Sequence, residues 1–190
     1  MGQAKSLEEI ELKRLLRIVS TGRNGRRNRL VILLGHWAGM RVGEIAALRV
    51  KDVINSDLLA KDSIYLAAGQ TKGNSARTVH VPKKLQDEIV GYMRKFPFTP
   101  AMDAPLIGSQ KSRNGFTANT LCTSVKHWYN LAAIDNGSSH SGRRTFLTKL
   151  ASKGVSARVL QELAGHKNLA TTQRYIDVND EMKRKAIELI

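Results

Sequence analysis

Apolar positions recur every three to four residues along most of the chain, a spacing that predicts amphipathic α-helices. The first such run ends at Thr21-Gly22, and its members form one helix face: Leu7, Ile10, Leu12, Leu15, Leu16 and Val19. Ser6-Leu7-Glu8-Glu9 has the pattern of a capping box, in which Ser6 accepts from first-turn N–H groups and Glu9 reaches back. We therefore expect the first helix to start directly after Ser6.

Helical patterns continue through the rest of the chain. They cover residues 30–39, 84–95, 117–133, about 140–151, 156–165 and 179–190. Gly39 and Gly165 are expected to end their helices, and Asn179 is expected to cap the last one. Residues 23–29 form a basic linker, whereas residues 96–115, which contain three prolines, predict a surface connection with few constraints.

A different pattern begins at Arg49, where short runs of β-forming residues are separated by turn residues. The runs are Val50 and Val53, Leu58-Leu59, Ile64-Tyr65-Leu66, and 78–81. They predict a small antiparallel sheet of three strands, with Lys72 in the loop before the last strand. The expected fold class is therefore α+β, mainly α-helical with a small three-stranded antiparallel sheet.

The composition of the chain indicates the kind of partner and the cellular location. A chain of 190 residues with a 42% apolar fraction predicts one domain, and a net charge of +15 predicts a polyanionic partner. Nucleic acid fits better than an anionic membrane because the basic residues are spread along the chain. The apolar run 30–40 is interrupted and too short to span a bilayer. Cys122 is the only cysteine, so we expect no disulfide and a reducing, cytoplasmic location.

Two segments place cations where their role stays open. Arg41 directly follows the buried helix, where an unpaired guanidinium would be costly. Either Glu44, three positions later, pairs with it, or Arg41 points into a site that binds an anion. Lys72, at the tip of a hairpin, is by itself typical of a solvated charge. The linker 23–29 fits a solvated turn and a phosphate-contacting turn equally well.

The last third of the chain holds the densest polar residues. In His140-Ser141-Gly142-Arg143-Arg144-Thr145, the spacing puts His140 and Arg143 on one helix face and turns Arg144 toward solvent. Further on, Tyr175 follows His166 by nine residues. A tyrosine in this setting is a nucleophile, a base-stacking platform or part of the core.

Four separated motifs together resemble those of the catalytic domain of tyrosine site-specific recombinases, the phage integrase family. The first is 39–44 with Leu48 and Asp52-Val53, the second is Thr71-Lys72, the third is 140–145, and the fourth is 163–166 together with 172–175. Each motif alone is weak, but the four occur in the family's order, and the similarity runs from about Ser6 to Asp177. Ser141-Gly142 replaces the acidic and leucine residues usual after the histidine, which alters local packing.

The resemblance implies DNA cleavage and religation through a covalent 3′-phosphotyrosyl intermediate, without metal, cofactor or ATP. Protein cations must then stabilise the pentacoordinate transition state, and a planar guanidinium does so by donating two hydrogen bonds. By resemblance, Arg41 and Arg143 take this role, and Tyr175 is the nucleophile. No carboxylate cluster of the kind that binds Mg²⁺ and no phosphate-cradling glycine loop accompanies these motifs.

The remaining motif residues handle protons in the same resemblance. His140 is the candidate general base or proton relay, and His166 donates a hydrogen bond to a non-bridging phosphate oxygen. Lys72 protonates the departing 5′-oxygen from a mobile hairpin, and Glu44 orients the site.

The partner implied is double-stranded DNA carrying a specific recombination site. Five further arginines are candidates for DNA contact: Arg23, Arg26, Arg27, Arg144 and Arg174. The resemblance also implies a monomer in isolation, a tetramer on synapsed DNA and accessory DNA-bending proteins, with no membrane association.

The expected domain organisation is one catalytic domain over residues 1–190, with a disordered tail at 1–5. The helix at 178–190 either docks on a neighbouring protomer or packs in cis. The DNA-clamping, core-binding domain that precedes this one in the family is absent, so the chain is either an excised domain or a short single-domain member. The competing classes are a type IB topoisomerase, a catalytically silent DNA-binding relative and a general nucleic-acid-binding module.

Overall fold

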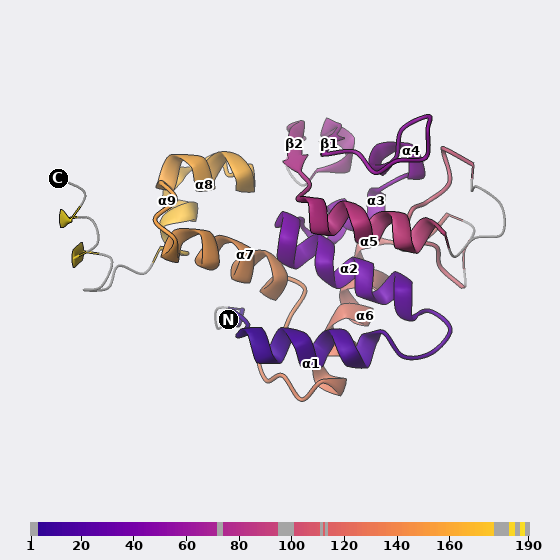
Figure 1. The fold of residues 1–190 in the computed structure, drawn as a ribbon, viewed down its shortest axis with the longest axis horizontal. Coiled ribbons are helices and arrows are strands. Elements are labelled where there is room, and N and C mark those ends of the chain that lie inside the picture. Colours follow the sequence, from indigo (N-terminus) through magenta and orange to yellow (C-terminus); the bar gives the residue numbers. More distant parts are fainter. Residues whose placement is uncertain are drawn as a thin grey trace.

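Helix α2 (Gly25–Ala38) runs through the middle of the molecule, with α1, α5 and α7 around it (Figure 1). The computed structural model describes residues 4–71, 74–94, 101–110, 112, 114–176, 183–184 and 187–188. The other helices are α1 (Glu9–Val19), α3 (Val42–Ala47), α4 (Val50–Val53), α5 (Lys83–Met93), α6 (Ala118–Leu131), α7 (Ser141–Ser152), α8 (Ala157–Ala164) and α9 (Leu169–Gln173). The strands are β1 (Ser63–Leu66) and β2 (Arg77–His80), and a short 3-10 turn, η1 (Ala68–Gln70), follows β1.

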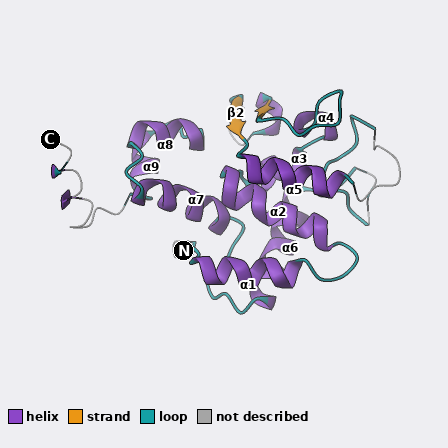
Figure 2. Ribbon diagram, viewed as in Figure 1, coloured by secondary structure: helices purple, strands orange, loops and turns teal. Residues whose placement is uncertain are grey.

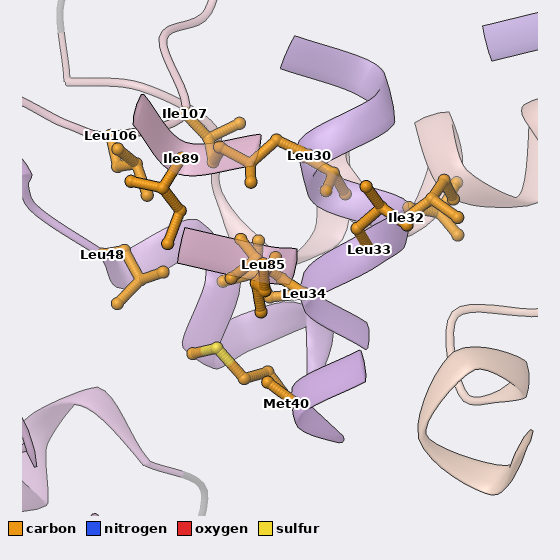
Figure 3. Packing of buried hydrophobic residues seen from close by; sticks show 14 of the residues in the cluster. Leu30, Ile32, Leu33, Leu34, Met40, Leu48, Leu85, Ile89, Leu106 and Ile107 are labelled. Carbon is orange, nitrogen blue, oxygen red and sulfur yellow. The ribbon is translucent and has the colours of Figure 1, made fainter. Parts of the chain in front are cut away.

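The main hydrophobic core is built from α1 to α6 and the sheet. Helix α2 supplies its centre, since Leu30, Leu33 and Leu34 are almost completely buried. Figure 3 shows Leu34 next to Leu85 of α5. The burial agrees with the sequence pattern, in which residues 30–34 are apolar on every side of the helix.

The sheet has two strands within the described residues, so the predicted third strand is wrong. β1 and β2 pair antiparallel, with Ile64 opposite Val79, and Figure 2 shows the pair in orange. The segment predicted as the first strand forms α4 instead. Asp52 explains the difference, because its carboxylate accepts the Arg49 N–H at 2.8 Å and thereby caps a short helical turn. The segment after α4 forms one isolated antiparallel bridge, between Ile54 and Ala60.

The starting residues of α1 and α2 both differ from the sequence prediction. α1 is capped at Glu8 rather than Ser6, because the carboxylate of Glu11 accepts the Glu8 N–H at 3.1 Å. Leu7 is buried, and its N–H donates to the Thr145 hydroxyl at 2.8 Å. α2 begins at Gly25, so most of the predicted basic linker is helical. Lys5, in the predicted tail, bonds to Glu11 and to the carbonyl of Asn136.

The predicted surface connection at 96–115 is partly core. Leu106 and Ile107 are completely buried, and the Leu106 N–H donates to the Leu48 carbonyl at 2.9 Å. The Tyr92 hydroxyl donates to the Leu106 carbonyl at 3.0 Å. An apolar pair directly after a proline was a usable signal for this burial. Residues 95–100, 111 and 113 lie outside the described residues.

Helices α2 and α7 cross closely because each has a glycine at the crossing. A Cβ on Gly142 would lie 3.0 Å from the backbone carbon of Gly35 and 3.1 Å from the ring of His36. This explains the glycine at a position where the family usually has leucine. His36 is buried at the same place and shares a 2.9 Å hydrogen bond with the Tyr129 hydroxyl.

Helices α8 and α9 form a second, smaller layer at the far end of α7, and Figure 1 shows them at the left of the molecule. The buried apolar cluster of this layer consists of Leu147 and Ala151 of α7 with Leu160 and Ala164 of α8. Tyr175 and Ile176 pack against it. Ser156 caps α8, as its hydroxyl accepts the Val159 N–H. The predicted Asn179 cap and most of the last helix lie outside the described residues.

Candidate active site

Arg41 and Glu44 are placed by the start of α3. Arg41 is the N-cap, and Glu44, three residues on, accepts its backbone N–H at 2.8 Å. The same carboxylate accepts from the Arg41 guanidinium at 2.9 Å. Arg41 pairs with Glu44, which is the first of the two alternatives that the sequence left open, and it also lines a cavity. Glu44 is almost completely buried, whereas the Arg41 side chain is 23% exposed.

Arg77, at the start of β2, is a second partner of Glu44 that sequence reasoning missed. Its Nη2 and Nε atoms donate to Glu44 at 2.7 and 3.2 Å, and its Nη1 donates to the Leu163 carbonyl at 2.9 Å. The available signal was the strand alternation, because Arg77 shares a strand face with the buried Val79. A cation on the inward face of a strand needs a buried partner.

The C-terminal end of α8 collects three arginines on consecutive carbonyl oxygens. Arg77 donates to Leu163, Arg143 to Ala164, and Arg41 to Gly165 at a long 3.5 Å. Carbonyls at a helix C-terminus lack helical partners and carry a partial negative charge, so they suit cations. Gly165 ends α8 in the left-handed region, at φ +60°, as its sequence position predicted.

Arg143 is the most enclosed of these cations. It lies in the first turn of α7, is 4% exposed, and donates to the Gly39 carbonyl at 2.8 Å. Burial, followed by the charges of Arg41 and Arg77, lowers the pKa of Arg143 to about 9. Arg143 therefore stays cationic at neutral pH while being poorly solvated, which strengthens its attraction to an anion.

His166 sits on the loop after α8 and is neutral at pH 7. Burial and the charges of Arg143, Arg41 and Arg77 lower the pKa of His166 to about 4. Its Nδ1 lies 2.9 Å from the hydroxyl of Thr172, which is completely buried in α9. When that hydroxyl donates to Nδ1, the ring carries its proton on Nε2 and can donate from there.

Tyr175 follows α9 and stacks on His166. The two ring centroids are 5.8 Å apart and the planes are inclined by 19°. The Arg144 guanidinium also lies over the Tyr175 ring, 5.8 Å from its centroid. The prediction that Arg144 turns toward solvent is therefore wrong: it is half-buried and faces Tyr175. The nine-residue separation of His166 and Tyr175 corresponds to the short helix α9 and the residues that flank it.

An open cavity of about 450 Å³ adjoins these groups. Arg41, Arg77 and His166 line it, together with Thr71 and the residues that begin α9. Lys72 lies outside the described residues, but its neighbour Thr71 is at the cavity wall. The cavity is therefore bounded by the hairpin on one side and by the His166 loop on the other.

His140 and the other arginines predicted to contact DNA lie outside this cluster of side chains. His140 is exposed at the N-cap of α7, so it does not share the buried face of Arg143. Arg26 and Arg27 are in the first turn of α2, about 20 Å along the helix from its Gly39 end, and Arg23 precedes the helix. Arg27 is buried, donates to the Gly108 carbonyl at 2.9 Å and lies over Phe116, so its guanidinium serves packing. Arg174 is exposed beside Tyr175.

No group of His, Cys, Asp or Glu side chains among the described residues is arranged to hold a metal ion. No helix that the structure describes is long and apolar enough to cross a membrane.

The chain belongs to the phage integrase family, whose family model matches residues 5–182. The fold and the spacing of the arginine, histidine and tyrosine motifs agree with this membership. Among curated proteins, it is 35% identical over 185 residues to the tyrosine recombinase XerA of Thermococcus kodakarensis, covering 97% of this chain and 62% of that one. It is 29% identical over 187 residues to XerA of Pyrococcus furiosus, covering 97% and 61%. The chain thus spans about three fifths of these relatives' length.

Solved structures give the same fold. A crystal structure of XerA recombinase superposes with a TM-score of 0.76 at 26% identity, covering 100% of this chain and 66% of that chain. The Tn1549 transposon integrase, solved in complex with transposon right end DNA, has a TM-score of 0.74 at 16% identity, covering 100% and 67%. The second likeness concerns the fold alone.

Proposed function

We propose that this chain is the catalytic domain of a tyrosine recombinase, which cuts and rejoins DNA strands at a specific site through a covalent 3′-phosphotyrosyl intermediate. The observation that carries the proposal is the convergence of Arg41, Arg143, His166 and Tyr175 from separate segments around the end of α8. Family membership and the similarity to the XerA recombinases support the same activity.

The arginines bind the scissile phosphate in this proposal. The Arg41 side chain is partly exposed and lines the cavity, while Glu44 holds its guanidinium from one side. Arg143 is enclosed between carbonyls of α8 and the end of α2. Two guanidinium groups in a poorly solvated setting stabilise the charge that develops on the pentacoordinate phosphorus, because little solvent reorganisation is needed.

Tyr175 supplies the nucleophile. Its Oη attacks phosphorus and displaces the 5′-oxygen of the next nucleotide, leaving the 3′-phosphate on the tyrosine. The phenol must lose a proton to attack, and the positive surroundings, Arg144 over its ring among them, favour the phenolate. Neutral His166 donates from Nε2 to a non-bridging oxygen when Thr172 donates to Nδ1.

Lys72 and His140 complete the proton transfers. We assign Lys72 to the departing 5′-oxygen because the hairpin that carries it borders the cavity at Thr71. His140 is assigned to the proton of Tyr175 as base or relay; its place at the exposed N-cap of α7 leaves it open to a bound strand. No step needs a metal or a nucleotide cofactor in this scheme.

The proposed substrate is double-stranded DNA, which the net charge of +15 suits. Assembly of four protomers on two DNA sites is part of the same proposal, as exchange between two duplexes requires four strand cleavages. DNA contacts by Arg23, Arg26 and Arg174, which are exposed, belong to it as well. The burial of Arg27 argues against a direct contact from that residue.

The test is covalent trapping on nicked DNA. The substrate is a library of duplexes with random sequence around the nick. Cleavage next to the nick frees a short fragment with a 5′-hydroxyl, which diffuses away and cannot be rejoined. The covalent adduct therefore accumulates and survives denaturant. We expect Tyr175→Phe to lower the adduct yield by about 1,000-fold or more, because no other group replaces the phenol oxygen. Peptide mapping should place the nucleotide on Tyr175.

Tyr65→Phe is the matched control, since Tyr65 is 65% exposed on β1 and loses the same hydroxyl. It should retain the wild-type yield. An adduct that persists undiminished in Tyr175→Phe would overturn the assignment of the nucleophile.

A further inference from the structure

Glu44 is a buried carboxylate with two arginine partners rather than one. Its two oxygens accept four N–H groups, two from Arg41 and two from Arg77, at 2.7 to 3.2 Å. The Glu44 side chain is only 1% exposed and that of Arg77 only 8%. A carboxylate this enclosed is stable as an anion only when it is well paired.

Arg41 and Arg77 differ in exposure and in how many of their N–H groups the protein occupies. Arg77 directs three of its N–H groups at Glu44 and Leu163, and its side chain is almost completely enclosed. Arg41 is nearly three times as exposed and makes a single side-chain contact with Glu44. The geometry therefore leaves Arg41 to meet an incoming phosphate, whereas the N–H groups of Arg77 at the cavity wall are taken up by Glu44 and Leu163.

Arg77 also joins three parts of the site. It belongs to β2, follows the Lys72 hairpin by five residues, and donates to the C-terminal turn of α8. A Cβ on Gly165 would lie 2.6 Å from the Arg77 Cδ, so the loop that carries His166 rests directly on this side chain. Because both ends of Arg77 are anchored, the side chain cannot move aside cheaply.

The charge balance gives Arg77 its effect on Arg41. Burial alone would raise the pKa of Glu44, but hydrogen bonds and charges, first from Arg77 and then from Arg41, lower the pKa below its ordinary value. Without Arg77, Glu44 would bind a proton more readily, and Arg41 would lose the anion that orients it.

We propose that Arg77 is a positioning residue of the active site, which keeps Glu44 ionised so that Glu44 can hold Arg41 in place for the scissile phosphate. The inference rests on the proposed function, since it describes how the same site is organised. It adds a residue outside the four sequence motifs that carry the family resemblance.

The first experiment needs no DNA. The carboxyl carbon of Glu44, followed by NMR as the pH is lowered, should titrate at higher pH in Arg77→Met than in the wild type. Arg29→Met is the matched control, because Arg29 also donates from its Nε and Nη2 atoms to one carboxylate, that of Glu88, at the partly exposed contact between α2 and α5. It should leave the Glu44 titration unchanged.

The second experiment measures covalent adduct formation on nicked DNA against pH. In Arg77→Met the rate at pH 7 should fall by about 100-fold, and its acid limb should move up by about one pH unit or more. When Glu44→Gln is already present there is no carboxyl to titrate, so adding Arg77→Met should cost less than about 5-fold and shift nothing. If Arg77→Met does not fold, Arg77→Lys takes its place, with a smaller shift in the same direction.

The outcomes separate the two proposals. A wild type that forms no adduct at any pH contradicts the proposed function before any variant is made. If the Glu44 titration moves in Arg77→Met but the acid limb of cleavage does not, Arg77 is not a positioning residue, although the recombinase assignment stands. An equal loss from Arg77→Met in the wild type and in the Glu44→Gln variant also overturns the inference.

Discussion

The two halves of the candidate site rest on hydrophobic clusters of very different size. Arg41, Glu44 and Arg77 belong to elements of the main core, where α2, α5 and the sheet bury a large set of apolar side chains. His166 and Tyr175 belong to the small layer of α8 and α9, whose own cluster has four buried residues. Helix α7 connects the two, with Arg143 in its first turn and Leu147 and Ala151 further along (Figure 1).

This difference separates the cations that bind phosphate from the group that attacks it. A segment with few buried apolar contacts opens at a lower free energy than the main core. We expect the layer of α8 and α9 to open without unfolding the rest, which would let Tyr175 adjust to DNA while the arginine pocket keeps its shape. The three arginine bonds to the end of α8 form a polar link between the two halves.

Matched leucine truncations give the largest effect and test the comparison directly. Leu34→Ala in α2 should lower the free energy of global unfolding by about 3–5 kcal/mol, since Leu34 is completely buried in the main core. Leu160→Ala removes the same atoms from an equally buried side chain of α8. It should lower the free energy of unfolding of the main core by less than about 1 kcal/mol, because its cost falls on the separate opening of α8 and α9.

Denaturant unfolding measures the stability of the main core, and amide hydrogen exchange measures the opening of α8 and α9. In Leu160→Ala, protection should be lost in α8 and α9 and kept in α2. Equal losses of main-core stability in the two variants would mean that the two halves unfold as one unit.

The join between the halves is tested by Gly142→Leu. The variant restores the family's usual leucine, but its side chain would collide with the backbone of Gly35 and the ring of His36. We expect a destabilisation of about 3 kcal/mol, at the upper end for overpacking, as α7 is pushed away from α2. Gly154→Leu adds the same volume in open space and controls for the loss of glycine, although its positive φ adds some strain. A Gly142→Leu protein as stable as the wild type in urea unfolding would show that the crossing can relax.

A smaller effect comes from the pH response of the main core. Burial, followed by the charge of Lys149, lowers the pKa of His36 to about 3. The unfolded chain binds a proton there near pH 6.5 and the folded chain does not, so stability is complete above pH 6.5 and falls as the pH drops toward 3. At pH 5 the loss is about 2 kcal/mol relative to pH 7.

Urea unfolding at pH 7 and pH 5 measures this loss. His36→Gln should remove about 2 kcal/mol of the difference between the two pH values, whatever its effect on stability at pH 7. His127→Gln, on the exposed side of α6, removes an imidazole that is not buried and serves as the control. An unchanged difference in His36→Gln would mean that the folded protein accepts a proton at His36.

Local signals accounted for the parts of the fold that were predicted correctly. Gly39 and Gly165 end their helices in the left-handed conformation, where a glycine avoids the cost of a side chain. Two predictions failed where a local signal was overlooked. Asp52 caps a helical turn in the segment predicted as a strand, and Glu11 moves the start of α1 beyond Ser6.

The sequence by itself determined that a basic chain carries a recombinase-like set of arginines, histidines and a tyrosine in a given order, and that Glu44 lies within reach of Arg41. Only the tertiary structure decided what surrounds them. Arg77 meets Glu44 across 33 positions of chain, and Arg143 is enclosed between carbonyls of Gly39 and α8. Spacing along a helix or strand fixes neighbours within an element, whereas the burial of a charge and its partners depends on which elements pack together, and this is the reason the Arg77 link required the folded chain.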